Sequence, residues 1–127
     1  MGNTAIVTMR YADGTPYEEA SYNDAGNLHG MNRLYHKNGT LSEASMFIDG
    51  KRAGVHRKWH SNGQIHVDAF FTEDVPDGLF RMWYPNGYPQ AELVYKKGNL
   101  EGMCKWYNQL GGIEVEQLYV NGIPFEH

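Results

Sequence analysis

The stretch YHKNGTLSEASMFIDGKRAG, residues 35–54, contains an Asn-Gly pair and an Asp-Gly pair eleven residues apart. Between these pairs apolar and polar side chains alternate, as they do in a β-strand with one buried face. Asn, Asp and Gly tolerate the positive φ angles that tight hairpin turns require. The stretch therefore predicts antiparallel strands that are joined by short turns at both ends.

The same pattern returns along the chain with a period of 24 residues, which identifies an internal repeat. The first copy is one residue longer, and the extra residue falls in YNDAG, where a turn is expected and an insertion costs little. Four columns of residues keep the period in phase. They are Gly39, Gly63, Gly87 and Gly111; Gly30, Gly54, Gly78 and Gly102; Tyr35, Trp59, Trp83 and Tyr107; and Phe47, Phe71, Tyr95 and Tyr119.

This repeat predicts an all-β fold, an antiparallel β-meander of about five 24-residue β-hairpins in one domain over residues 1–127. About ten strands spaced by roughly 4.8 Å would form a sheet about 45 Å long. Because one hairpin cannot bury its own apolar face, neighbouring units must stabilise one another. The expected units are approximately residues 11–34, 35–58, 59–82, 83–106 and 107–127.

Composition narrows the classes of function. The net charge of −4 and the pI of about 5.8 provide no overall positive field that would attract nucleic acid or anionic lipid. The single cysteine, Cys104, rules out an intrachain disulfide and fits a reducing compartment. No apolar run approaches the roughly 20 residues of a membrane helix, so a soluble, cytoplasmic protein is expected.

The geometry of the Asn-Gly turn decides which side chains share a face. If the turn carries a β-bulge, Trp59 lies opposite Ile65 and Tyr35 lies opposite Leu41. Counting by twos from these pairs then predicts one face for each of two hairpins. The first set is Val55, Arg57, Trp59, Ile65, Val67, Ala69 and Phe71, and the second is Leu79, Arg81, Trp83, Pro89, Ala91, Leu93 and Tyr95.

A column of cations is the main candidate for a binding site. Each cation precedes a repeated aromatic residue by two positions and so shares its face, with equivalent residues about 9.6 Å apart. Such ladders suit cation–π contacts or an acidic partner. Alternatively, the arginine stems cover apolar sheet while their charged ends reach water or acids such as Glu43. The candidate binding residues are Arg33, Arg57, Arg81 and Lys105 with Tyr35, Trp59, Trp83 and Tyr107.

Catalytic and metal sites are not expected. His36 and His60 recur in adjacent units but stand too far apart to share a metal ion, and His60 and His66 flank a turn without a third ligand. The repeated acids indicate a solvated column rather than an acid–base pair. These acids are Asp68, Glu92 and Glu116. We expect no enzyme activity, no metal and no cofactor.

Three segments resemble the MORN-repeat family, particularly its second variant, which occurs in bacteria and viruses. They are YHKNGTLSEASMFIDGKRAG, WHSNGQIHVDAFFTEDVPDGLF and WYPNGYPQAELVYKKGNLEGMC, and the resemblance covers residues 11–123. It implies a single-layer, twisted antiparallel sheet with an aromatic-lined groove and no catalytic activity. Bacterial proteins of this type are commonly described as antitoxins of toxin–antitoxin pairs. The sequence departs from the pattern at Asp74, at Pro89 and at the NQLGG segment of residues 108–112.

We therefore expect a protein-interaction module of the antitoxin or immunity type, whose partner is a protein such as a cognate toxin. Aromatic and arginine side chains are those that dominate protein interfaces. The alternative is a structural or viral scaffold protein that self-assembles into a homo-oligomer through its edge strands, although Pro124 disfavours open-ended growth. Phospholipid binding is a third, weaker candidate, because the chain is acidic overall.

Overall fold

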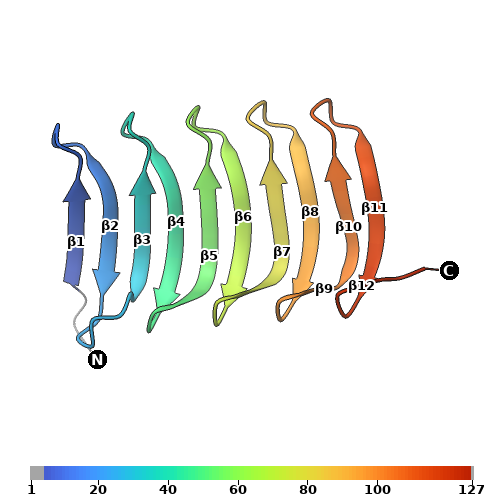
Figure 1. The fold of residues 1–127 in the computed structure, drawn as a ribbon, viewed down its shortest axis with the longest axis horizontal. Helices are drawn as coiled ribbons and strands as arrows, with labels where there is room; N and C mark the ends of the chain where they lie inside the picture. Colours follow the sequence, from blue (N-terminus) through green and yellow to red (C-terminus); the bar gives the residue numbers. More distant parts are fainter. Residues whose placement is uncertain (1–4, 127) are drawn as a thin grey trace.

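A computed structural model describes residues 5–126, which form one long antiparallel sheet of twelve strands (Figure 1). No helix occurs within residues 5–126, and the all-β meander predicted from the repeat is confirmed. The strands are β1 (Ala5–Arg10), β2 (Pro16–Tyr22), β3 (Gly30–Tyr35), β4 (Leu41–Ile48), β5 (Lys51–Trp59), β6 (Ile65–Thr72), β7 (Val75–Trp83), β8 (Pro89–Lys96), β9 (Asn99–Leu100), β10 (Gly102–Tyr107), β11 (Ile113–Val120) and β12 (Ile123–Pro124).

The ten long strands follow one another in the sheet in sequence order, so that each pairs with the adjacent long strands of the chain. Upper turns close the five hairpins β1–β2, β3–β4, β5–β6, β7–β8 and β10–β11, and lower turns connect one hairpin to the next (Figure 1). The two-residue strands β9 and β12 pair with the ends of β8 and β11 beside the lower turns. The ten long strands are the ones that the sequence predicts.

The upper turns contain the expected β-bulge. Trp59 pairs with Ile65, and Gly63 adopts a φ of 90° in a turn closed by the bond from its N–H to the His60 carbonyl, 2.9 Å. Beyond the bulge, however, Lys58 pairs with Val67. Because the bulge inserts one extra residue into the second strand, every later side chain of that strand changes face.

The predicted grouping of side chains is therefore wrong for the second strand of each hairpin. Val67, Ala69 and Phe71 pair with Lys58, His56 and Gly54, and they lie on the face opposite to Arg57 and Trp59. The same holds for Ala91, Leu93 and Tyr95, which pair with Met82, Phe80 and Gly78. Counting every second residue across the turn left out the extra residue that the bulge inserts, and the second strand was therefore assigned to the wrong face.

The two faces of the sheet differ in burial. The core face, which carries His56, Val67 and Ala69, leaves these residues 4–6% exposed. The open face carries Arg57 and Phe70, and 49% of Phe70 is exposed. Residues 5–126 form a single layer, so side chains on the core face bury each other across neighbouring strands.

The core face is apolar in the fourth and fifth hairpins. Ala91, Leu93 and Cys104 form the buried cluster, and Phe80 and Tyr95 pack against it. The Phe80 and Tyr95 rings lie 5.7 Å apart between centroids. The apolar contacts therefore cross from one hairpin to the next, as a repeat protein requires.

The core face is more polar in the second and third hairpins. A hydrogen bond of 2.5 Å joins Ser45 Oγ to His56 Nδ1, and the two residues are 2% and 6% exposed. The Arg52 guanidinium lies over the Phe47 and Phe71 rings, 5.5 and 5.9 Å from their centroids. Cation–π contacts thus occur on the core face, at a residue that the sequence did not single out.

Asparagine side chains connect successive upper turns. Asn62 Oδ1 accepts the Gln64 N–H within its own turn, and Asn62 Nδ2 donates to the Pro85 carbonyl of the next turn, 2.8 Å away. Asn38 and Asn86 do the same, with donor bonds of 3.1 and 2.9 Å to the next turn. One side chain thus shapes its own turn and binds the neighbouring hairpin.

Replacing Asn62 by aspartate should remove only the second of these bonds. The aspartate keeps an acceptor for Gln64 N–H but places an oxygen against the Pro85 carbonyl. We expect Asn62→Asp to lower the free energy of unfolding by about 1–3 kcal/mol, measured by urea denaturation. Gln64→Glu adds the same charge to the same turn without touching the bond, and it should cost less than about 0.5 kcal/mol. Equal losses in the two variants would contradict this role.

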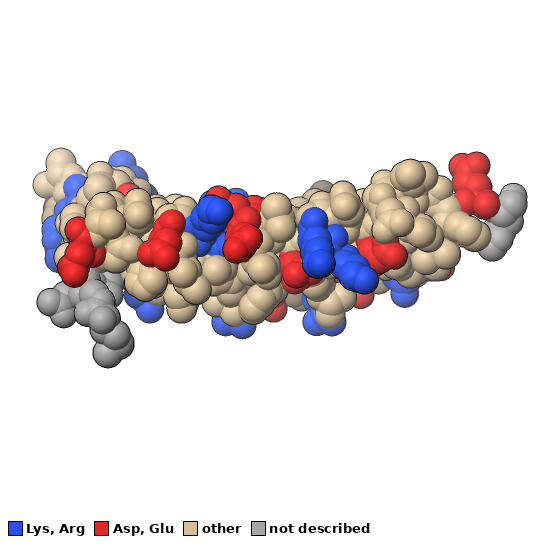
Figure 2. All heavy atoms as spheres, turned by 90° about the horizontal axis from the view of Figure 1, so that it is seen from below, with Lys and Arg blue, Asp and Glu red and all other residues tan. Residues whose placement is uncertain are grey.

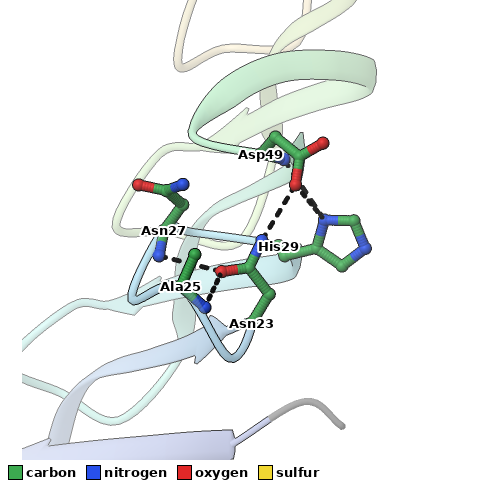
Figure 3. Close-up of polar contacts among 5 residues, drawn as sticks. All are labelled: Asn23, Ala25, Asn27, His29 and Asp49. Carbon is green, nitrogen blue, oxygen red and sulfur yellow. Dashed lines mark hydrogen bonds and ion pairs between the residues drawn. The ribbon is translucent and has the colours of Figure 1, made fainter. Parts of the chain in front are cut away.

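The lower turns also link neighbouring hairpins, as Figure 3 shows for the first of them. Asn23 Oδ1 accepts the N–H groups of Ala25 and Asn27, and Asn23 Nδ2 donates to Asp49 Oδ1 at 2.9 Å. His29 Nδ1 in turn accepts the Asp49 N–H at 3.2 Å. The longer first turn, where the extra residue was expected, is therefore tied to the second lower turn.

The departures from the repeat pattern do not alter the turns. Asp74 stands where other copies have glycine, yet it adopts the same left-handed conformation, with a φ of 72°, and its N–H bonds the Arg52 carbonyl at 2.9 Å. In the NQLGG segment, Gly111 N–H bonds the Asn108 carbonyl at 3.1 Å, as Gly63 bonds His60. Asp is among the residues that tolerate this conformation.

Candidate interaction face

The open face places the predicted cations in a row with acids. Across the sheet, each cation pairs in register with acids of the adjacent strands, except that Ala44 stands at one acidic position. We call this row the charge stripe, and its four cations and four acids give it no net charge. Its members, in strand order, are Glu19, Arg33, Arg57, Asp68, Arg81, Glu92, Lys105 and Glu116.

Seen along the strands the molecule is a thin slab, and basic and acidic groups alternate along one margin of it (Figure 2). One pair of the charge stripe is in direct contact: Arg57 Nε lies 3.3 Å from Asp68 Oδ1. Both side chains are nearly half exposed, 48% and 44%, so the pair contributes at most about 1 kcal/mol. The acids that the sequence presented as a separate solvated column therefore neutralise the cation column.

Glu43 is not the partner of these arginines. It lies on the core face, where its Oε1 is 3.6 Å from Lys58 Nζ. The expectation that an arginine head reaches a neighbouring acid holds for Arg57 and Asp68. The acid that the sequence suggested, Glu43, lies on the other face. The reason is again the bulge, which moves Glu43 away from the face of Arg33 and Arg57.

The repeated aromatic residues share the open face with the cations, as predicted. The Tyr35 hydroxyl donates to Glu19 Oε1, and the Tyr107 hydroxyl donates to Glu92 Oε1 at 3.0 Å. The pKa of Tyr35 is raised mainly by its hydrogen bond to Glu19, and that of Tyr107 mainly by burial and then by Glu92. Both phenols thus remain protonated donors at neutral pH.

Trp59 and Trp83 occupy the equivalent positions in the central hairpins, and both are half-buried. Their backbone carbonyls accept hydrogen bonds from His36 Nε2 and His60 Nε2, at 2.9 and 2.8 Å. These bonds hold each tryptophan at the end of its strand. The aromatic stripe, as we call Tyr35, Trp59, Trp83 and Tyr107, thus runs beside the charge stripe just below the upper turns.

A third row, the apolar stripe, runs along the other side of the charge stripe. Each of the four hairpins from β3 to β11 contributes one cross-strand pair of large apolar side chains to it. Exposure is high for Phe70, Leu79 and Met103, at 49%, 51% and 45%. The pairs are Met31 with Met46, Val55 with Phe70, Leu79 with Val94, and Met103 with Leu118.

A hollow of about 260 Å³ interrupts the apolar stripe near the middle of the sheet. Val55, Phe70 and Leu79 supply its apolar lining, and Asp68 and Arg81 of the charge stripe supply the polar side. An apolar side chain of a binding partner could enter this space. Exposed apolar surface next to charged groups is typical of interaction sites.

The sequence placed Val55 and Leu79 on the face of the cations, as the structure does, but the apolar stripe was not singled out although its signal is present. Met31, Val55, Leu79 and Met103 recur every 24 residues, four positions before each repeated aromatic residue. The second column follows in the other strand of each hairpin, but only the bulge brings the two together on the open face. Its members are Met46, Phe70, Val94 and Leu118.

Residues 5–126 show neither a metal-binding cluster nor a membrane-spanning helix. No group of three or more His, Cys, Asp or Glu side chains is arranged to hold a metal ion in that range. His60 and His66 stack with ring centroids 4.1 Å apart. The pKa of His66 is lowered first by burial and then by the nearby His60. In the same part of the chain, no helix has the length and apolarity needed to cross a membrane.

The comparison with known families identifies one hairpin. Residues 76–97 match the family model described as MORN repeat variant. The matched segment runs from β7 through the upper turn to the end of β8, and it includes Arg81 and Trp83 of the open face. This match supports a repeat protein that acts as a binding module. No curated protein matches the chain.

Proposed function

We propose that this protein is a non-catalytic interaction module of the antitoxin or immunity type, which binds a protein partner through its open face in the cytoplasm. The observation that carries the proposal is the alignment of three stripes on that face: aromatic, charged and apolar. Interfaces combine the same elements, with aromatic and apolar anchors beside polar groups that set orientation. The free, buried Cys104 fits a reducing compartment.

The arrangement favours a partner that lies across the strands. Each hairpin repeats the three stripes, so a partner meets equivalent binding groups about every 9.6 Å. The charge stripe has no net charge, so it selects for matched polar groups rather than for a strongly acidic or basic partner. Occupying the active surface of a toxin in this way would block access of its substrate.

Removing two aromatic anchors should abolish partner binding. The chain is co-expressed with the product of the gene adjacent to its own, and the complex is measured by size-exclusion chromatography and calorimetry. We expect a 1:1 complex, and Trp59→Ala with Trp83→Ala should weaken it by about 10³-fold, since each anchor contributes about 2 kcal/mol. For an antitoxin, the adjacent product alone should arrest growth, and co-expression should restore it.

Trp106→Ala is the matched control, because it removes the same side chain from the core face, where Trp106 packs against Tyr119. Binding is compared at a temperature where all variants are folded by circular dichroism. Trp106→Ala should bind the partner as the unchanged chain does. The proposal fails if the adjacent product does not bind, or if the double variant binds with unchanged affinity.

A further inference from the structure

We infer that a second copy of the chain covers the open face, so that the protein is a face-to-face dimer in the absence of a partner. This inference concerns the same face as the proposed function but does not depend on any foreign partner. It rests on three features of the open face. These are the alternation of charge along the charge stripe, the exposed apolar stripe beside it, and the area available.

The order of charges along the charge stripe is complementary to the same order read in the opposite direction. A two-fold axis parallel to the strands, placed between β5 and β6, turns the two open faces toward each other and reverses the strand order. Arg57 then faces Asp68 of the second copy, and Asp68 faces its Arg57. An axis that runs along a strand would instead place like charges against each other. The alternation therefore selects axes that lie between strands.

The axis between β5 and β6 also gives the largest overlap, because it divides the ten long strands equally. With this axis Arg33 faces Glu92 of the second copy, and Glu19 faces its Lys105. Ala44, the single neutral position within the row, faces the long Arg81 of the second copy. The one gap in the alternation thus lies where an arginine needs space.

The apolar stripe is brought onto itself by the same rotation. Val55 faces Phe70 of the second copy, and Met46 faces its Leu79. The hollow lined by Val55, Phe70 and Leu79 lies beside the axis, where a side chain of the second copy can enter it. Half-exposed Phe70 and Leu79 would thereby lose their contact with water.

The available area suffices for a stable dimer. Ten strands spaced by about 4.8 Å, each about 20 Å long, give an open face of about 950 Å². Full overlap would bury about 1,900 Å² in total, within the usual range for specific complexes. Twisted sheets pack at about 30° to each other, so the pairs nearest the axis keep the closest match.

The mass of the full chain in solution gives the first test. Analytical ultracentrifugation should show a closed dimer of about 29 kDa, twice the chain mass of 14.5 kDa. Phe70→Glu should raise the dimer dissociation constant at least about 100-fold, since the change occurs twice in each interface. Leu110→Glu, at an upper-turn residue that is 87% exposed, is the matched control and should leave the dimer unchanged.

A mixing experiment tests the axis itself. Arg57→Asp alone and Asp68→Arg alone each place like charges across the axis, so each variant should be monomeric. Mixed together they should form a heterodimer, because both facing pairs beside the axis are again opposite in charge, while the pair within each chain stays broken. Circular dichroism confirms that both variants are folded before mixing.

Several results would overturn the inference. One is a wild-type monomer at about 100 μM, well above the dissociation constants of specific dimers. Another is mixing that yields no heterodimer. A third is a series of growing species that Phe70→Glu does not affect, as edge-strand assembly would give. If the chain is a monomer that still binds the adjacent gene product, this inference alone is wrong. If it is a dimer that does not bind that product, the proposed function alone is wrong.

Discussion

Leu93→Ala is expected to lower the free energy of unfolding by about 2–5 kcal/mol, because it empties the centre of the buried cluster. Leu93 is 9% exposed and belongs to one buried cluster with Ala91 of the same strand and Cys104 of the adjacent β10. In a repeat sheet this side chain stabilises two hairpins at once. Urea denaturation measures the loss, and hydrogen exchange should show the fastest opening in β7, β8 and β10.

Val94→Ala provides the control, since Val94 is the next residue in β8 but lies on the open face. Its partial exposure means that truncation removes fewer contacts, and we expect a loss of less than about 1 kcal/mol. If both variants lost the same free energy, the assignment of the two faces would be wrong. This comparison therefore tests the consequence of the bulge directly.

Acid is expected to destabilise the protein through His56. Burial lowers the pKa of His56 in the folded state, and Arg52 and Lys58 add to this while Glu43 opposes it. In the unfolded chain the pKa is about 6.5. The unfolded state therefore binds the proton more readily, so this contribution is fully present above about pH 6.5 and is lost progressively below it.

The third and fourth hairpins suggest a variant that removes His56 while keeping the packing of the core face. Ala69 and Phe80 pair there in the position that Ser45 and His56 occupy one unit earlier. Ser45→Ala with His56→Phe should therefore reduce the dependence of the unfolding free energy on pH between about 7 and 5. A smaller dependence should remain from His66, whose pKa burial also lowers, and His66→Gln should remove it. An unchanged pH dependence in the double variant would exclude His56 as the cause.

The 24-residue repeat in the sequence determined the fold. Glycine and aromatic columns at a period of 24 residues predict hairpins of equal length, because backbone conformation at each turn depends on local residues such as Asn62 and Gly63. The pairing of Trp59 with Ile65 followed from the same turn chemistry and is confirmed. The shared face of Arg57 and Trp59 also followed, since both lie on one strand.

The composition of each face was decided by the tertiary structure. One extra residue at every upper turn moves Val67 and Phe71 to the core face and brings Asp68 and Phe70 beside Arg57 on the open face. The period of a strand is two, so a shift of one residue exchanges all its side chains between faces. Columns in a sequence show which residues are equivalent, but only the register between strands shows which residues meet. The predicted row of cations is for that reason a neutral row of alternating charges.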